Sequence, residues 1–138
     1  NTSTEYERVD FDTLLAESDI LSLHCPLTDR TQNIINADAL AKMKKTAILI
    51  NVARGPVVDE QALYDALENG TIAAAGLDVL VKEPIAADNP LGKIKDSTKL
   101  LITPHMAWGS HEARERCAKE VYQNIESFLN GKERNIVV

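Results

Sequence analysis

The chain has 138 residues, of which 44% are hydrophobic and only 4% are aromatic, and its formal net charge is -6 with a pI near 5.0. This length and composition predict one globular unit with an aliphatic core. The acidic balance argues against a nucleic acid or an anionic membrane as partner, because both attract basic surfaces. No apolar run approaches the roughly 20 residues of a membrane span and no signal-peptide pattern opens the chain, so we expect a cytoplasmic protein.

Strand and helix patterns alternate along the sequence after a polar entry over residues 1–10. We expect helices over residues 11–17, 37–44, 60–69 and 110–130, and strands over residues 20–25, 47–52, 72–79 and 100–103. Asn36, Asp59 and Ser110 are predicted N-caps, and Gly70 and Gly131 stand where a helix C-terminus favours a left-handed backbone. Strands that alternate with helices predict an α/β fold with a parallel sheet and right-handed crossovers.

The two cysteines, Cys25 and Cys117, have no metal-type spacing. In an intracellular protein, such a pair indicates neither a disulfide framework nor a metal site. We therefore expect two reduced thiols in the core and no bound metal.

The segment 48–56 organises the rest of the chain. Its apolar run ends at Arg54, Gly55 and Pro56, and a run so short is typical of a strand buried on both faces. Ligands of open α/β sheets bind beyond the C-terminal ends of the strands. Arg54 is therefore placed where a cation could hold an anionic substrate.

Two further ionisable residues follow later elements, Glu83 before Pro84 and His105 after Pro104. If the strands are parallel, Arg54, Glu83 and His105 emerge at the same edge of the sheet. Guanidinium binds carboxylate bidentately, imidazole exchanges protons near neutral pH, and a carboxylate can orient the imidazole. The trio therefore predicts proton transfer beside a substrate that bears a carboxylate.

Each candidate also has a simpler structural explanation. Arg54 could form a surface ion pair, and Glu83 could be an exposed loop residue. Asp78 could bind a ligand amide or cap the next turn, and Trp108 could be a pocket wall or a packing anchor. The remaining histidines, His24 and His111, are expected to be a hydrogen-bonded structural residue and a solvated residue respectively.

Four ordered motifs together resemble the D-isomer-specific 2-hydroxyacid dehydrogenase family, and most closely its glycerate dehydrogenase and hydroxypyruvate reductase branch. The resemblance covers about residues 11–130 and implies a Rossmann-like domain in a nicotinamide-dependent oxidoreductase. The motifs are Leu23-His24-Cys25-Pro26-Leu27-Thr28, Asn51-Val52-Ala53-Arg54-Gly55, Ala75-Gly76-Leu77-Asp78-Val79 with Glu83-Pro84, and Thr103-Pro104-His105-Met106-Ala107-Trp108.

The resemblance implies a role for each candidate. Arg54 would hold the substrate carboxylate, His105 would protonate the keto oxygen as hydride arrives, and Glu83 would keep His105 protonated. Trp108 would shape the substrate pocket together with Arg54 and His105. The residues implied to contact the nicotinamide part of NAD are Cys25, Pro26, Ala53, Asp78, His105 and Ala107.

No two of the six glycines are separated by one residue, so the chain has no G-x-G-x-x-G phosphate loop. We therefore expect a fragment: residues 1–109 as the second half of an NAD(P)-binding domain, and residues 110–138 as the helix and tail leading back to a substrate domain. The ribose-reading residue would be missing too, so NAD is the family default and NADP is not excluded. The fragment itself is expected to be inactive.

The substrate would be a small 2-oxo or 2-hydroxy acid, and the family resemblance implies a homodimer for the parent protein. Two other functions stay open from the sequence. The same trio would suit a nicotinamide-sensing corepressor on the same fold, and a bare sheet edge could make the chain a self-associating structural fragment.

Overall fold

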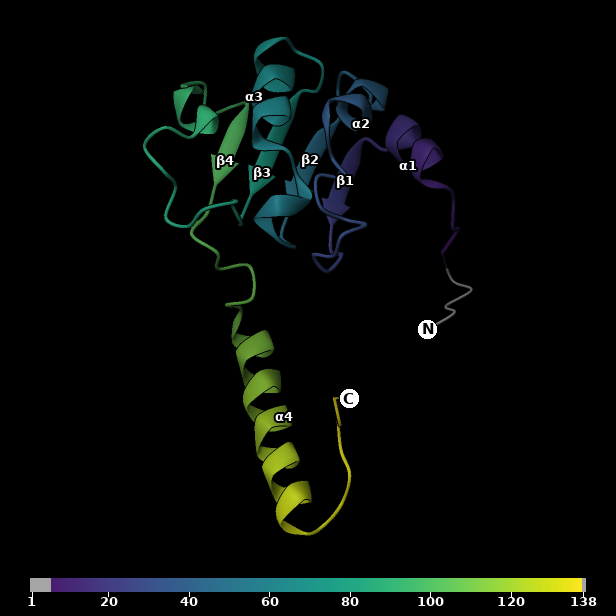
Figure 1. The fold of residues 1–138 in the computed structure, drawn as a ribbon, viewed down its shortest axis with the longest axis vertical. Helices are drawn as coiled ribbons and strands as arrows, with labels where there is room; N and C mark the ends of the chain where they lie inside the picture. The colour runs from purple at the N-terminus through teal and green to yellow at the C-terminus, as the bar shows by residue number, and fades with distance from the viewer. Residues whose placement is uncertain (1–5, 138) are drawn as a thin grey trace. The chain divides into compact units, whose positions relative to one another are not determined.

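The computed structural model describes residues 6–137, which form two units, one ending at His105 and one beginning at Met106. The first unit holds the sheet and most of the helices (Figure 1). Its elements are α1 (Phe11–Glu17), β1 (Ile20–Leu23), α2 (Ala37–Lys42), β2 (Ile48–Asn51), α3 (Glu60–Glu68), β3 (Ala74–Leu77) and β4 (Leu100–Ile102), with short 3-10 helices η1 (Gly55–Val57) and η2 (Pro90–Lys93). The second unit is α4 (His111–Leu129) and the tail after it.

All four strands are parallel and lie in the order β1-β2-β3-β4, which confirms the predicted parallel sheet. One row of paired residues crosses the whole sheet, from Leu23 through Asn51 and Leu77 to Ile102. This row marks the C-terminal edge, where the strand arrows end in Figure 1. Loops that leave the four strands therefore begin side by side.

The core lies on one face of the sheet. Strands joined in sequence by crossovers of one hand place their connecting helices on the same side, and α1 contacts α2, α2 contacts α3, and α3 contacts η2. Leu49 is 0% exposed on that side, whereas Ile20 and Leu101, which point to the other side, are each 64% exposed. The prediction of a strand buried on both faces was therefore wrong for β2, whose Ile48 and Ile50 are only half-buried.

The predicted N-caps and the two glycine C-termini are confirmed, but α2 ends at Lys42 and not at residue 44, because Met43 has an extended backbone. The side chains of Asn36, Asp59 and Ser110 accept hydrogen bonds from the first-turn N–H groups of α2, α3 and α4. Gly70 and Gly131 have φ of 67° and 65°. The strands are shorter than expected, because the chain leaves the sheet at Leu23 and Leu77 to form the loops of the site, and the polar entry predicted over residues 1–10 lies partly outside the described residues.

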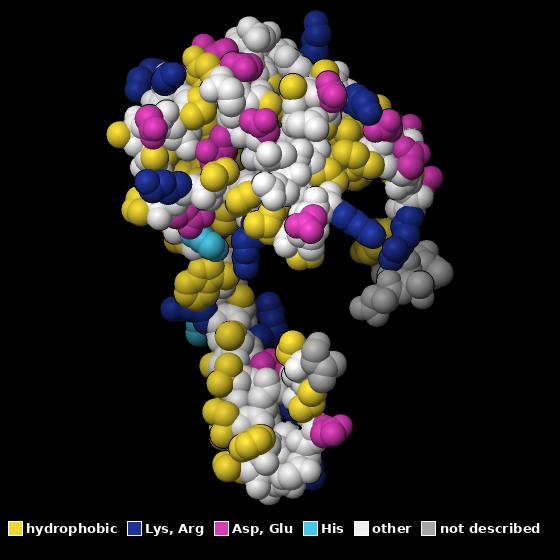
Figure 2. Space-filling view, in the orientation of Figure 1, with side chains coloured by type: hydrophobic (Ala, Val, Ile, Leu, Met, Phe, Trp, Pro, Cys, Tyr) yellow, Lys and Arg dark blue, Asp and Glu magenta, His cyan; other side chains and the backbone are white. Residues whose placement is uncertain are grey.

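No residue of α4 is buried, and Figure 2 shows apolar side chains gathered along this helix. The expectation of two core thiols was wrong for Cys117, which is exposed on α4, whereas Cys25 is partly buried and packs against the core. Within this unit the tail lies against the polar side of α4, where Arg134 donates to Glu120 and Gln123. Across residues 6–137, no helix is long and apolar enough to cross a membrane, and no group of three His, Cys, Asp or Glu side chains could hold a metal ion.

Candidate active site

Arg54 stands beyond the C-terminal end of β2, as predicted, and a buried polar side chain shapes the chain there. Asn51 is 1% exposed. Its Oδ1 accepts from the N–H of Ala53 at 3.0 Å, and its Nδ2 donates to the carbonyl of Arg54 at 3.0 Å. Because an amide side chain that bonds its own backbone two or three residues on makes a turn, Asn51 ends the strand and exposes Arg54.

Arg54 lines an open pocket of about 560 Å³ between the ends of β1 and β2. Its Nη1 donates to the carbonyl of Ala53 at 2.7 Å, which leaves other guanidinium N–H groups to face a ligand. Three residues implied to contact nicotinamide border the same pocket: Cys25, Pro26 and Ala53. The ring of His24 is hydrogen-bonded to Ser22 at 2.8 Å, in agreement with the structural role expected for it.

Glu83 and His105 form a hydrogen-bonded pair, as expected for a carboxylate that orients an imidazole. Glu83 Oε2 lies 2.7 Å from His105 Nδ1, and Glu83 Oε1 accepts from the N–H of Leu80 at 3.0 Å. The hydrogen bond from Leu80, and then the one with His105, lower the pKa of Glu83 below its ordinary value of 4.5. Glu83 is therefore a carboxylate at neutral pH, and it fixes Nδ1 as the ring nitrogen that carries a proton toward it.

His105 has a φ of 52°, in the left-handed region that residues other than glycine rarely adopt. Its backbone N–H donates to the carbonyls of Asp78 at 2.9 Å and Thr103 at 3.0 Å, which hold this conformation. Residues in such sparsely populated conformations cluster at functional sites, where the surrounding structure maintains them. The turn directs the His105 ring toward the loop that carries Glu83.

A second pocket, of about 520 Å³, joins the ends of β3 and β4. Asp78, Glu83 and His105 line it together with the apolar side chains of Leu80, Pro84, Ile85 and Ile102. Asp78 is 6% exposed, and its Oδ1 accepts a hydrogen bond from Thr103 Oγ1 at 2.5 Å. The pocket thus combines apolar walls with one carboxylate acceptor and one acid–base pair.

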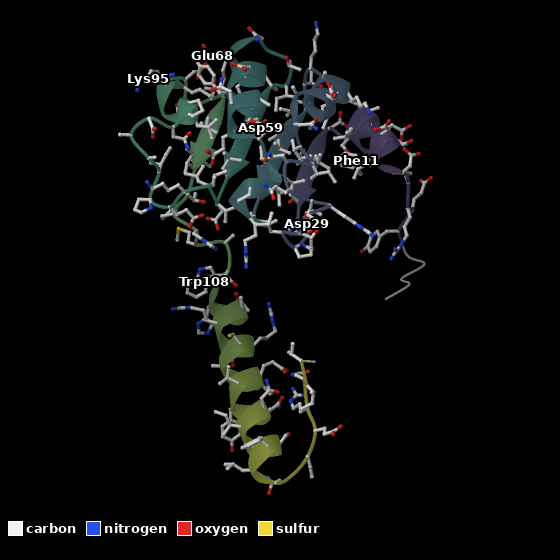
Figure 3. All side chains as sticks on the ribbon, viewed as in Figure 1. Phe11, Asp29, Asp59, Glu68, Lys95 and Trp108 are labelled. Atoms are coloured by element: carbon white, nitrogen blue, oxygen red, sulfur yellow. The ribbon has the colours of Figure 1, made fainter. Side chains whose placement is uncertain are left out.

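The structure therefore pairs Glu83 with His105, and places Arg54 at the end of a neighbouring strand but in a separate pocket. Ala107 and Trp108 lie in the second unit, just before α4, where Figure 3 labels Trp108. Trp108 is 65% exposed.

Two polar residues of the site were missed as functional candidates from the sequence, namely Asn51 and Thr103. A signal existed for each. Asn51 is a lone amide inside an apolar strand, and Thr103 follows Ile102 as Asp78 follows its register partner Leu77.

Comparison with known families places the chain. Residues 1–107 match the D-isomer specific 2-hydroxyacid dehydrogenase NAD-binding domain. A glycerate dehydrogenase of Methylorubrum extorquens is 49% identical over 129 residues, which are 94% of this chain and 41% of that protein. A hydroxypyruvate reductase of Blautia hydrogenotrophica is 46% identical over 129 residues, which are 94% of this chain and 39% of that protein. The chain thus spans about 40% of the length of these relatives.

Solved structures agree with the sequence matches. An acyclic imino acid reductase in complex with NADPH and D-Arg superposes with a TM-score of 0.88 at 39% identity, covering 100% of this chain and 43% of that one. A D-lactate dehydrogenase with NAD+ from Lactobacillus jensenii gives a TM-score of 0.82 at 39% identity, covering 94% of this chain and 42% of that one. These matches confirm the predicted Rossmann-like fold and the predicted family. The chain belongs to the D-isomer specific 2-hydroxyacid dehydrogenase family, and its residues 1–107 come from the NAD-binding domain of that family.

Proposed function

We propose that this chain supplies the acid–base pair and the substrate-binding arginine of an NAD(P)-dependent 2-hydroxyacid dehydrogenase. The observation that carries the proposal is the 2.7 Å contact between Glu83 and His105, at the sheet edge that also presents Arg54. Relatives named glycerate dehydrogenase, hydroxypyruvate reductase and glyoxylate reductase support a small 2-oxo acid as the substrate.

The chemistry follows from the three side chains. Arg54 binds the substrate carboxylate, because a planar guanidinium matches it with two parallel hydrogen bonds. With Nδ1 turned to Glu83, His105 gives a proton to the keto oxygen from Nε2 during reduction, and accepts it back during oxidation. Glu83 holds the ring by Nδ1, so that Nε2 is the nitrogen presented to the keto oxygen.

The pocket at the ends of β3 and β4 fits a nicotinamide ring. Its walls are apolar, and the buried Asp78 offers a carboxylate oxygen to a carboxamide N–H. Thr103 holds that carboxylate by donating to Oδ1. When bound, the nicotinamide would supply the hydride, and Asp78 would hold its carboxamide. The family resemblance assigns further contacts with the nicotinamide part of the cofactor to Cys25, Pro26 and Ala53, which border the neighbouring pocket, and to Ala107. NAD is the preferred cofactor in this proposal, with NADP as the alternative.

We further propose that the protein acts in the cytoplasm and as a homodimer, and that Trp108 shapes the substrate pocket. The chain alone is expected to turn over little substrate, because its sequence has no G-x-G-x-x-G loop for a pyrophosphate. The relatives, which are named as dehydrogenases and reductases, do not favour the corepressor interpretation.

A chimera tests the proposal. The chain replaces the matching 129 residues of the Methylorubrum extorquens glycerate dehydrogenase, and reduction of hydroxypyruvate is followed with NADH and with NADPH. His105→Asn, which tolerates the left-handed backbone, should lower kcat by about 10²–10⁴-fold. His111→Asn changes an exposed histidine in α4 and should leave kcat unchanged. Full turnover in the His105→Asn chimera would refute the assignment.

A further inference from the structure

Glu83 lies in a long irregular connection. Between Leu77, which ends β3, and Pro90, which begins η2, the chain forms no helix or strand. Backbone ladders therefore cannot fix where the Glu83 carboxylate lies relative to His105. Individual side-chain contacts must do so.

One carboxylate outside the pocket joins both ends of this connection. Glu60 stands in the first turn of α3, and its Oε1 accepts from the N–H of Val81 at 2.7 Å. Its Oε2 accepts from Nδ2 of Asn89 at 2.7 Å. Asn89 is 8% exposed, and its Oδ1 caps η2 by accepting from the N–H of Leu91 at 3.0 Å. Glu60 thus ties the loop at Val81 to an anchored residue at its far end.

The contact at Val81 acts on the residue that binds Glu83. Leu80 and Val81 are consecutive, and the N–H of Leu80 donates to Glu83 Oε1 while the N–H of Val81 donates to Glu60. Holding the peptide at Val81 limits how far the preceding peptide can move, and that peptide carries the Leu80 N–H. That N–H in turn holds Glu83 with Oε2 directed at His105.

We propose that Glu60 is a positioning residue for Glu83. Its carboxylate binds the loop at Val81 and Asn89, and this clamp holds the loop in the conformation that keeps Glu83 within hydrogen-bond distance of His105. The importance of this clamp for catalysis rests on the function proposed above. The clamp itself is a property of the folded chain and can be measured without turnover.

The measurement is the pKa of the Glu83 carboxyl, followed by ¹³C NMR of the side chain in the full chain. Glu60→Ala should raise the pKa of Glu83 toward its ordinary value, because a loosened Leu80 N–H stabilises the carboxylate less. Loss of the Glu60 charge alone would have the opposite sign, since removing a nearby negative charge favours the ionised form of Glu83. Glu68→Ala, an exposed position at the other end of α3, should leave the pKa of Glu83 unchanged.

An exchange of the two clamp residues provides a rescue. In Glu60→Gln the amide can still accept from Val81, but its NH₂ group opposes the NH₂ group of Asn89. Adding Asn89→Asp gives that NH₂ an acceptor, keeps an oxygen to cap η2, and restores the net charge. The single variant should raise the pKa of Glu83, and the double variant should return it to the wild-type value. If Glu60→Ala does not fold, the comparison of the Glu60→Gln single variant with the double variant still tests whether Glu60 positions Glu83.

An unchanged or lowered pKa of Glu83 in folded Glu60→Ala or Glu60→Gln would overturn the proposal. In the chimera, Glu60→Ala should lower kcat by about 10-fold to 100-fold, the scale of a small misplacement in an active site, with recovery in the exchanged double variant. If the NMR shifts occur as expected but Glu83→Gln leaves kcat unchanged, the clamp stands and the proposed function fails.

Discussion

Gly55 follows Arg54 directly and lies against the loop that leads to Glu83, so a methyl group there tests how the site is assembled. A Cβ at Gly55 would lie 2.0 Å from both the carbonyl carbon and the carbonyl oxygen of Leu80, and 2.4 Å from the N of Val81. Ordinary contact begins at 3.4 Å, so the loop backbone would have to retreat by about 1.4 Å. Forced overpacking costs about 1–3 kcal/mol, and a clash with backbone belongs at the upper end.

We therefore expect Gly55→Ala to lower the free energy of unfolding by about 3 kcal/mol, measured by urea denaturation. Alanine substitutions at two other glycines serve as controls, because they introduce a methyl group without this clash. Gly92 has open space within 4 Å, so Gly92→Ala should be neutral or stabilising by up to about 1 kcal/mol. Gly70 also has open space, but its φ of 67° should make Gly70→Ala cost about 1–2 kcal/mol.

The loop displacement has its own signature. In Gly55→Ala the N–H groups of Leu80 and Val81 move away from Glu83 and Glu60, so the pKa of Glu83 should rise toward its ordinary value. Neither Gly70→Ala nor Gly92→Ala should change it. If Gly55→Ala is as stable as Gly92→Ala and the pKa of Glu83 stays low, the prediction is refuted. That result would show that the contact of Gly55 with Leu80 and Val81 does not constrain the site.

Three further predictions concern polar groups of the site. Asn51→Ala leaves a buried N–H and a carbonyl without their side-chain partner and should cost about 2 kcal/mol in urea denaturation; a cost below 0.5 kcal/mol, the range of surface substitutions, would contradict the turn role. Because the pKa of Glu83 is lowered from 4.5, its stabilising contribution is present above pH 4.5 and is lost as the pH falls through the folded-state pKa. Glu83→Gln should therefore flatten the stability curve as the pH falls below 4.5, and an unchanged curve there would argue against the hydrogen bonds from Leu80 and with His105 that lower this pKa. Thr103→Val removes the hydroxyl donor to Asp78 and should weaken NADH binding by the chimera, whereas Thr103→Ser keeps the hydroxyl and should bind NADH as the wild-type sequence does. Equal NADH affinities of the two variants would exclude a role of the hydroxyl in cofactor binding.

The arrangement of the sheet was predictable because the sequence repeats a simple alternation. Short aliphatic runs separated by capped helices leave a parallel sheet as the consistent fold, and that topology brings Arg54, Glu83 and His105 to one edge. The N-caps at Asn36 and Asp59 were equally readable, since capping depends on a residue and its neighbours three positions on.

The burial of the sheet could not be read in the same way. A short aliphatic strand has the same sequence pattern whether one face or both faces of the sheet are covered. The half-burial of Ile48 and Ile50 could therefore not be predicted from the sequence. The exposure of Cys117 has a similar cause. The apolar stripe of α4 predicts a surface to be covered, but within the described residues nothing buries it.

Polar contacts across the loops lay beyond the sequence for a different reason. Asp78 and Thr103 are neighbours only because Leu77 pairs with Ile102, and a slip of one residue between β3 and β4 would turn Thr103 to the opposite face of the sheet. The observed register turns Leu100 and Ile102 toward the core, whereas the slipped one would turn Leu101 alone, between Lys99 and Thr103, so the aliphatic pattern favours the observed register. The hydrogen bond from Thr103 to the buried Asp78 favours the same register, because the slipped register would leave that carboxylate without this donor. The hydrogen bond that orders the site thus reinforces the register that the aliphatic residues of β4 favour.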